Sequence, residues 1–144
     1  MAKIQVFLDT DVVISALLSQ TGASYEILNN PQIIKNISKT VKKEVKEVVK
    51  RLNIKSQKVK VIYTKIKTSS LHLTKKQVLE RYGYFVIDEK DSQIVAGAER
   101  AKTKFLLTYN LKHYRVDKIK AELGITVVKP GNFLQYLRSI NKFS

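Results

Sequence analysis

The chain has 144 residues, 44% of them hydrophobic, which suits one globular domain spanning residues 1–144 and excludes a largely disordered chain. Its 27 Lys and Arg residues against 12 Asp and Glu residues give a formal net charge of +15. Such a charge favours a polyanionic partner, most often nucleic acid, although a lysine-rich solvated surface would have the same composition. The absence of cysteine excludes disulfides, thiolate catalysis and cysteine-based zinc sites.

The N-terminal segment combines a strand-like run with two carboxylates. Residues 4–8 form a short apolar run typical of a buried strand, and Asp9, Thr10 and Asp11 separate it from a helix expected at 12–19. In open α/β sheets ligands bind at such strand ends, so the two carboxylates are candidates for helix N-caps, metal ligands or both. They also interrupt the apolar run that a signal peptide would need. Since no apolar run approaches the roughly 20 residues of a membrane span, we expect a cytoplasmic protein without membrane contact.

The next segments are expected to hold two helices. Residues 23–28 form a short helix that ends before Pro31, because the residue before proline avoids the α region. Residues 32–36 are a short, extended segment. Ser38 has the position of an N-cap for a longer helix that runs to about residue 52.

This longer helix carries an apolar stripe and two glutamates. At about 100° per residue, the apolar side chains share one face. The stripe consists of Val41, Val45, Val48, Val49 and Leu52. Glu44 borders the stripe and Glu47 lies further round toward solvent, so Glu44 is the better candidate to reach a cleft. The alternative for both is a surface helix with mixed charges, which is the commoner case for a single Glu.

The middle of the chain is less regular. Residues 54–67 fit a helical face, which we prefer, although residues 58–61 alternate like a strand. The lysines of this stretch form a basic surface suited to a phosphate backbone. Thr74 is expected to cap a short helix at 75–82, and residues 84–87 are expected to form a strand.

An acidic cluster opens the following helical segment, residues 88–101. Asp91 shares a face with Ile94 and Val95, where an unpaired carboxylate would be costly, so a functional role is favoured for it. For Asp88 the favoured role is the helix cap.

The C-terminal part repeats the strand and helix alternation. Residues 104–107 are a buried strand followed by the polar residues 108–110, and 125–128 are a further strand. Helices are expected at 115–123 and 132–140. The alternation predicts an α/β protein, a three-layer α/β/α sandwich with a mainly parallel central sheet.

Parallel strands have their carboxyl ends at one edge of the sheet. Residues just after Leu8, Ile87 and Leu107 should therefore meet there, with Glu44 approaching from the long insertion. The side chains brought together are Asp9, Asp11, Asp91 and Asn110. Hard oxygen ligands of this kind suit Mg²⁺ or Mn²⁺.

Four segments in chain order also carry a family resemblance. They are F-L-D-T-D-V-V-I-S-A-L (residues 7–17), E-V-K-E-V-V-K-R (44–51), D-S-Q-I-V-A-G-A (91–98) and L-L-T-Y-N (106–110), the last followed by L-K-H-Y. Together they resemble the motifs of the PIN domain, a nuclease fold shared by toxins of bacterial and archaeal toxin–antitoxin pairs. The closing I-T-V-V-K-P-G-N-F-L at 125–134 is similar to the final strand and helix of this family.

The resemblance implies a metal-dependent ribonuclease that hydrolyses RNA phosphodiester bonds. Asp9, Glu44 and Asp91 would hold one or two Mg²⁺ or Mn²⁺ ions, assisted by Asn110 or Asp11. Thr10 and Thr108 would order the loops or a ligated water, with a plain helix cap as the alternative for Thr10. The resemblance further implies a homodimer and a small antitoxin whose segment fills the cleft.

Two residues depart from the usual pattern of the family. Asp11 stands where asparagine is usual, which adds negative charge near the metal. Asn110 stands where a fourth acid is frequent, and it can ligate through its carbonyl oxygen or hold a water but contributes no charge. Asp11 would partly offset that loss.

Two alternatives stay open. Residues 9–13 also satisfy the D-x-D-x-[TV] motif of haloacid-dehalogenase-like phosphatases, but the chain lacks their Gly-Asp-x-x-x-Asp motif and is short for that fold. A catalytically inactive PIN-like module that binds RNA or a partner protein is the other, and Asn110 favours it. His72 and His113 are isolated in sequence and receive no role, and Tyr109 is assigned to base stacking or to packing.

Overall fold

The computed structural model describes residues 3–141, in which five strands form one sheet with the order β3-β2-β1-β4-β5. The strands are β1 (Ile4–Leu8), β2 (Ile33–Ser38), β3 (Ile66–Ser69), β4 (Phe105–Leu107) and β5 (Thr126–Val128). Every neighbouring pair is parallel. All carboxyl ends therefore lie at the same edge of the sheet, as the sequence predicts.

Helices cover both faces of this sheet. They are α1 (Thr10–Leu18), α2 (Ala23–Leu28), α3 (Lys39–Arg51), α4 (Ser56–Tyr63), α5 (Lys75–Tyr82), α6 (Ser92–Arg100), α7 (Val116–Leu123) and α8 (Pro130–Asn141). Short 3₁₀ turns are η1 (Gly83–Phe85), η2 (Glu89–Asp91) and η3 (Leu111–His113).

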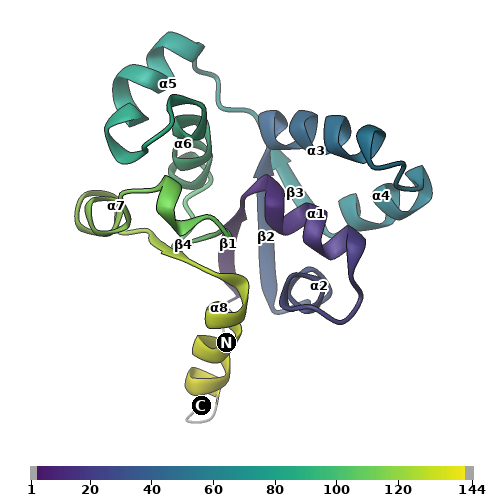
Figure 1. The fold of residues 1–144 in the computed structure, drawn as a ribbon. Coiled ribbons are helices and arrows are strands. Elements are labelled where there is room, and N and C mark those ends of the chain that lie inside the picture. The colour runs from purple at the N-terminus through teal and green to yellow at the C-terminus, as the bar shows by residue number, and fades with distance from the viewer. Residues whose placement is uncertain (1–2, 142–144) are drawn as a thin grey trace.

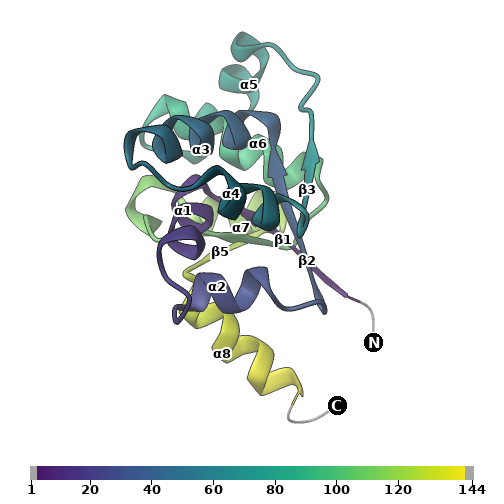
Figure 2. The same cartoon turned by 90° about the vertical axis from the view of Figure 1, so that its right-hand side faces the viewer.

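The chain order of the strands explains how the helices are distributed. The chain moves from β1 to β2 to β3 in one direction and then crosses back to β4 and β5, so right-handed crossovers place α1–α4 on one face and α5–α7 on the other. Figure 1 shows α1 and α3 on one side of β1 and β2, with α6 and α7 on the opposite side. Helix α8 packs against α2 and extends away from the sheet (Figure 2). The predicted α/β/α sandwich with a parallel sheet is confirmed.

The central strand β1 and its neighbour β4 form the middle of the core. In β1 and β4 the side chains of Phe7, Leu8, Leu106 and Leu107 are completely buried. Gly97 allows α6 to lie directly on this layer, because a Cβ at that position would stand 2.5 Å from the Phe7 ring. The buried strand centre fixes the positions of the residues that follow each strand.

Local signals place several helix ends where the sequence predicts them. The Ser38 hydroxyl accepts a 3.2 Å hydrogen bond from the Val41 amide at the start of α3. Thr74 and Gln77 form a capping box at the start of α5. Gly124 ends α7 with a φ of 70°, a left-handed conformation that glycine adopts without strain.

Three expectations are wrong. The helix expected over residues 54–67 stops at Tyr63, and Ile66–Ser69 is instead the edge strand β3, in which only Ile66 is buried. Most side chains of this edge strand are exposed, so its sequence lacks the apolar alternation that predicts a strand. Residues 84–87 are not a strand in the sheet but a 3₁₀ turn followed by an isolated antiparallel bridge between Val86 and Tyr114. Leu52, placed on the inner stripe of α3, is 47% exposed because the helix ends before it.

None of the helices within residues 3–141 is long and apolar enough to cross a membrane.

Candidate active site

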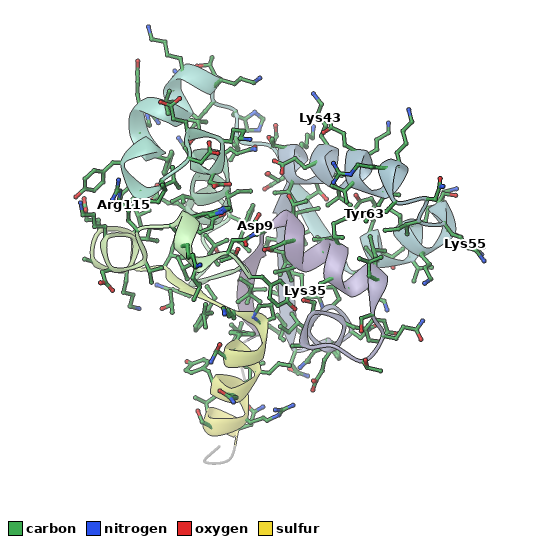
Figure 3. All side chains as sticks on the ribbon, in the orientation of Figure 1. Asp9, Lys35, Lys43, Lys55, Tyr63 and Arg115 are labelled. Carbon is green, nitrogen blue, oxygen red and sulfur yellow. The ribbon has the colours of Figure 1, made fainter. Side chains whose placement is uncertain are left out.

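The polar strand ends meet where the strand order reverses. β1 pairs with β2 on one side and with β4 on the other, so Asp9 after β1 and residues 108–110 after β4 lie next to each other. The Asp9 amide donates a 3.0 Å hydrogen bond to the Leu107 carbonyl and joins the two strand ends. Figure 3 shows Asp9 near the middle of the molecule, while Lys43 projects outward from α3. In open parallel sheets, ligands usually bind at the point where the strand order reverses.

Three donors hold the Asp9 carboxylate. Its Oδ1 accepts from the Thr10 amide at 2.7 Å, and its Oδ2 accepts from the Thr108 hydroxyl at 2.9 Å and the Tyr114 hydroxyl at 2.8 Å. Burial and the nearby Asp9 charge raise the pKa of Tyr114 far above its ordinary value, so this phenol stays protonated and donates. The Asp9 side chain is therefore held in one orientation, and it is also the N-cap of α1.

Asp11 binds the loop that follows β4. Its Oδ2 accepts hydrogen bonds of 3.0 Å from the Tyr109 amide and from the Asn110 side-chain amide. Thr108 is 3.4 Å away, but its single hydroxyl proton goes to the nearer Asp9. The other oxygen, Oδ1, is buried and accepts no hydrogen bond. Burial first and the Asp9 charge second raise the pKa of Asp11 to about 7.

Glu44 reaches the cluster from α3, as its position on the helix predicts. Its Oε2 accepts a 3.1 Å hydrogen bond from the Thr10 hydroxyl, and its Oε1 accepts a 2.7 Å hydrogen bond from the Gln93 amide. Burial, with a contribution from Asp9, raises the pKa of Glu44. Glu47 is exposed. Thr10 is the first residue of α1 and orients Glu44, so the alternative that it caps the helix is wrong.

Asp91 enters from the opposite face of the sheet, at the end of η2. It makes no cap hydrogen bond to α6, and its Oδ2 lies 3.4 Å from His113 Nδ1. Burial and the Asp9 charge raise the pKa of Asp91 to about 6, although His113 opposes the shift. Asp88, by contrast, caps η2 by accepting a 3.0 Å hydrogen bond from the Lys90 amide, as expected for a cap.

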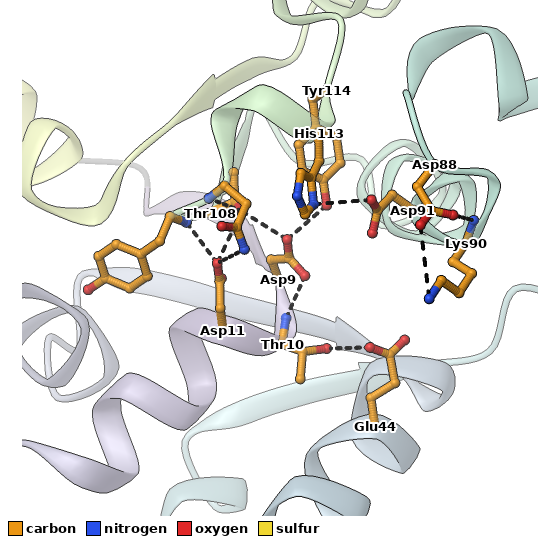
Figure 4. Close-up of polar contacts among 12 residues, drawn as sticks. Asp9, Thr10, Asp11, Glu44, Asp88, Lys90, Asp91, Thr108, His113 and Tyr114 are labelled. Atoms are coloured by element: carbon orange, nitrogen blue, oxygen red, sulfur yellow. Dashed lines mark hydrogen bonds and ion pairs between the residues drawn. The ribbon is translucent and has the colours of Figure 1, made fainter.

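Figure 4 shows these acids around one centre, with Asp9 between Asp11 on one side and Asp91 on the other, and with Glu44 approaching from α3. Sequence reasoning missed three of their partners, namely Gln93, His113 and Tyr114. His113 and Tyr114 lie three and four residues after the L-L-T-Y-N segment, and hydrogen bonds to the distant residues 85–87 help to place them. Ile87 N donates to His113 O at 2.9 Å and Arg115 N donates to Phe85 O at 2.8 Å. The hydroxyl groups of Tyr109 and Ser24 share a hydrogen bond of 2.6 Å.

The donor set fits a hard divalent cation. Within residues 3–141, His113 is the only basic side chain at ion-pair distance from these four carboxylates, although the protein carries a charge of +15. Burial first, and repulsion from Asp9 as a smaller cause, raise the pKa values of Asp11, Glu44 and Asp91, and Asp11 Oδ1 has no hydrogen-bond partner, so a cation would relieve both. Among the described residues no three acid or histidine side chains are gathered as a ready metal site, so binding requires these side chains to draw closer.

Comparisons with known proteins give the family and the fold of the chain. The sequence matches the family described as PIN domain over residues 5–112, and the chain belongs to this family. That membership removes the phosphatase alternative. A search of curated proteins gives no significant match.

Several solved structures have a similar fold. VapBC2 from Rickettsia felis bound to a DNA fragment from their promoter has a TM-score of 0.59 and 19% identity, covering 86% of this chain and 97% of that chain. A toxin–antitoxin complex from Klebsiella pneumoniae has a TM-score of 0.59 and 19% identity, covering 87% and 97%. DNA-bound VapBC from Salmonella typhimurium has a TM-score of 0.58 and 17% identity, covering 88% and 98%. At these identities the likeness establishes the fold.

Proposed function

We propose that this PIN domain is a Mg²⁺- or Mn²⁺-dependent ribonuclease that hydrolyses RNA phosphodiester bonds. The observation that carries the proposal is the meeting of Asp9, Glu44 and Asp91, in which the Asp9 charge acts on both other carboxylates. Asp9 follows β1, Glu44 lies within α3 and Asp91 ends η2, and no lysine or arginine of the described residues neutralises them. An excess of carboxylates is a poor site for RNA unless a cation accompanies them.

A divalent cation, when bound, would lower the pKa of a water and offset negative charge on the scissile phosphate. Asp9, Glu44 and Asp91 are the residues that would hold it, with Asp11 as a further acid. The chain's own contribution is orientation. Thr108 and Tyr114 fix Asp9, and the hydroxyl of Thr10 fixes Glu44. The excess of lysine and arginine raises the local concentration of RNA.

Asn110 also acts on Asp11 in this proposal, while the expected role of its carbonyl oxygen as a ligand stays a prediction. Its side-chain nitrogen donates to Asp11, so it positions an acid. In this proposal Asn110 is a positioning residue, and Asp11 supplies the charge that the family usually has at position 110.

The test compares cleavage of labelled single-stranded RNA by the wild type and by Asp9→Asn and Asp91→Asn. We expect cleavage with Mg²⁺ or Mn²⁺, none with a chelator, and a loss of at least 100-fold in both variants, in the range seen when electrostatic groups are removed from active sites. Thermal unfolding shows whether the variants stay folded. Cleavage that survives in both folded variants would contradict the proposal.

A second candidate is a PIN module that binds RNA without cutting it. The observation that favours it is Asn110 in place of a frequent fourth acid, which removes one charge from the ligand set. The same assay separates the two functions, because a binding module retains RNA in the presence of chelator and never shortens it when Mn²⁺ is added.

The biological setting is proposed from the neighbours' descriptions. The Klebsiella structure is a toxin–antitoxin complex, and the other two are VapBC assemblies with DNA. This chain would accordingly be a toxin that pairs with a small antitoxin and forms a homodimer. Sedimentation of the purified chain tests the dimer, and protection of growth by a co-expressed neighbouring gene product tests the antitoxin.

A further inference from the structure

The side chain of Tyr109 links the loop after β4 to two helices. Tyr109 lies in the exposed part of this loop, between Thr108 and Asn110, whose side chains donate to Asp9 and Asp11. Its main-chain amide donates a 3.0 Å hydrogen bond to Asp11 Oδ2. Its side-chain hydroxyl lies within hydrogen-bond distance of hydroxyl groups on α1 and α2. Tyr109 therefore contacts an acid of the site at one end and the helical layer at the other.

The Tyr109 side chain follows the surface of α1. Asp11 accepts from the Tyr109 amide, and the hydroxyl of Ser15, one turn further along α1, lies 3.4 Å from the Tyr109 hydroxyl. Residues at this spacing lie on one face of a helix, about 6 Å apart along its axis. The side chain therefore runs along one turn of α1, and its hydroxyl reaches the start of α2.

The firmer anchor of the Tyr109 hydroxyl is Ser24. Ser24 lies in the first turn of α2, it is completely buried, and the two hydroxyl groups are 2.6 Å apart. Within residues 3–141 no other hydrogen bond is recorded for the Ser24 hydroxyl, and a hydroxyl that is buried without a partner costs free energy. Tyr109 is 38% exposed, so packing alone does not fix its position. The shared hydrogen bond therefore satisfies Ser24 and holds Tyr109.

We infer that Tyr109 is a positioning residue of the active site. Its hydroxyl, anchored on Ser24, holds the loop after β4 so that the Tyr109 amide orients Asp11. Asp11 depends on this loop, because its Oδ1 accepts no hydrogen bond and the side-chain and amide donors recorded for its Oδ2 within residues 3–141 all belong to residues 108–110. The inference rests on the proposed ribonuclease function for its effect on catalysis. It couples α2, which carries none of the acids, to the acid cluster.

The first measurement follows the Tyr109 amide directly in the metal-free protein. Its exchange with water is measured by NMR in Tyr109→Phe and Ser24→Ala, each of which removes one partner of the anchor. We expect exchange about fivefold faster than in the wild type in both variants, the factor that corresponds to one lost hydrogen bond. The controls are Tyr82→Phe, which loses a phenol hydrogen bond of the same 2.6 Å length to Glu99, and Ser15→Ala, which loses the longer contact. Both controls should stay within about twofold of the wild type.

The second measurement is the affinity for Mn²⁺, obtained from the electron paramagnetic resonance signal of the free ion. We expect about fivefold weaker binding in Tyr109→Phe and Ser24→Ala, less than the roughly 10- to 100-fold loss on removing a direct partner of a metal ligand, because the amide itself stays. The double variant Tyr109→Phe/Ser24→Ala should bind Mn²⁺ no more weakly than either single variant, because both changes remove the same interaction. Thermal unfolding shows that each variant is folded at the temperature of the measurements.

RNA kinetics separate this role from a contact with the substrate. Tyr109→Phe keeps the aromatic ring, so a role in stacking on a base would leave kcat and KM of this variant at their wild-type values. A positioning role predicts that kcat falls about fivefold with KM unchanged, in Tyr109→Phe and in Ser24→Ala alike.

The outcomes separate this inference from the proposed function. Unchanged exchange of the Tyr109 amide in both Tyr109→Phe and Ser24→Ala would overturn the inference, whether or not the wild type cuts RNA. Faster exchange with the Mn²⁺ affinity of a metal-binding wild type would also overturn it, since the anchor would then hold the loop without acting on Asp11. A wild type that neither binds Mn²⁺ nor cuts RNA defeats the ribonuclease proposal alone, because faster amide exchange in the two variants still supports the positioning role.

Discussion

The side-chain amide of Asn110 donates a 3.0 Å hydrogen bond to the carboxylate of Asp11, which ties the loop after β4 to the start of α1. These are the two residues that depart from the usual PIN pattern, and they depart in opposite senses. An acid stands where an amide is usual, and an amide stands where an acid is frequent. Because the two side chains touch, the pair still contains one carboxylate and one amide at the same place.

This contact predicts the effect of exchanging the two residues. Asp11→Asn leaves two amides and removes the negative charge of the pair. Asn110→Asp replaces the hydrogen bond by two carboxylates that repel each other. We expect each single variant to lose at least tenfold in Mn²⁺-dependent RNA cleavage, and the double variant Asp11→Asn/Asn110→Asp to recover to within about threefold of the wild type. A double variant no better than the weaker single variant would show that the two positions act independently.

A second prediction concerns the hydrogen bond from Tyr114 to Asp9. Tyr114→Phe removes a donor from a carboxylate that keeps its bonds to Thr10 and Thr108. We expect a stability loss of about 1 kcal/mol, the size of one hydrogen bond, and a fall in kcat of about tenfold with little change in KM. Tyr82→Phe is a suitable control, since Tyr82 donates to Glu99 away from the cluster. Equal effects on kcat in both variants would assign Tyr114 a role in stability alone.

The raised acid pKa values predict how stability depends on pH. Asp11 and Asp91 have pKa values of about 7 and 6 in the folded protein, against an ordinary value of 3.8. Between about pH 4 and 7 the native state therefore holds more protons than the unfolded state, so the free energy of unfolding of the metal-free protein falls as pH rises and levels off above 7.

Chemical denaturation at several pH values checks this sign. We expect Asp11→Asn to match the wild type near pH 4 and to be more stable by on the order of 1 kcal/mol at pH 8, less than the full shift implies because solvent reaches the site. A difference in stability that shrinks with rising pH would contradict the raised pKa of Asp11. Addition of Mn²⁺ should stabilise the wild type more than the variant at pH 8.

The contact of α6 with β1 gives a stability prediction far from the chemistry. A Cβ at Gly97 would stand 2.5 Å from the Phe7 ring, which is buried and cannot move aside. Gly97→Ala should therefore cost about 1–3 kcal/mol. Gly131→Ala is the control, because nothing lies within 4 Å of its Cβ position and α8 should gain slightly. Urea denaturation of both variants measures the difference, and an equal stability for the two would contradict the packing seen here.

How much of the fold could be predicted depends on how local each signal is. The Ser38 cap, the Thr74 capping box and the turn at Gly124 need only neighbouring residues, so the helices that they delimit were predicted closely. β3 was missed because it exists through pairing with β2, and its exposed residues carry no pattern. The region around Val86 was misassigned because a bridge to a distant segment decides its conformation.

The same distinction between local signals and tertiary contacts applies to the residues of the site. Asp9, Glu44 and Asp91 can be named as candidates because each belongs to a sequence motif, and the structure places all three on one side of the sheet edge without closing them into a ready metal site. Their partners Gln93, His113 and Tyr114 could not be inferred, since each touches an acid from another element. The link between Asp11 and Asn110 likewise needs the adjacency of β1 and β4. The motifs therefore point to the candidate acids, and only the tertiary contacts show which residues orient them.

The most direct test of the central claim is a crystal structure of this protein soaked in Mn²⁺, with anomalous diffraction data. We expect a manganese peak bonded to carboxylate oxygens of Asp9 and Asp91, with Glu44 turned toward it, and no such peak in Asp9→Asn crystals treated in the same way. An empty acid cluster in crystals that hold manganese elsewhere, or a peak at the cluster that remains after Asp9→Asn, would contradict the claim that these acids bind the catalytic metal.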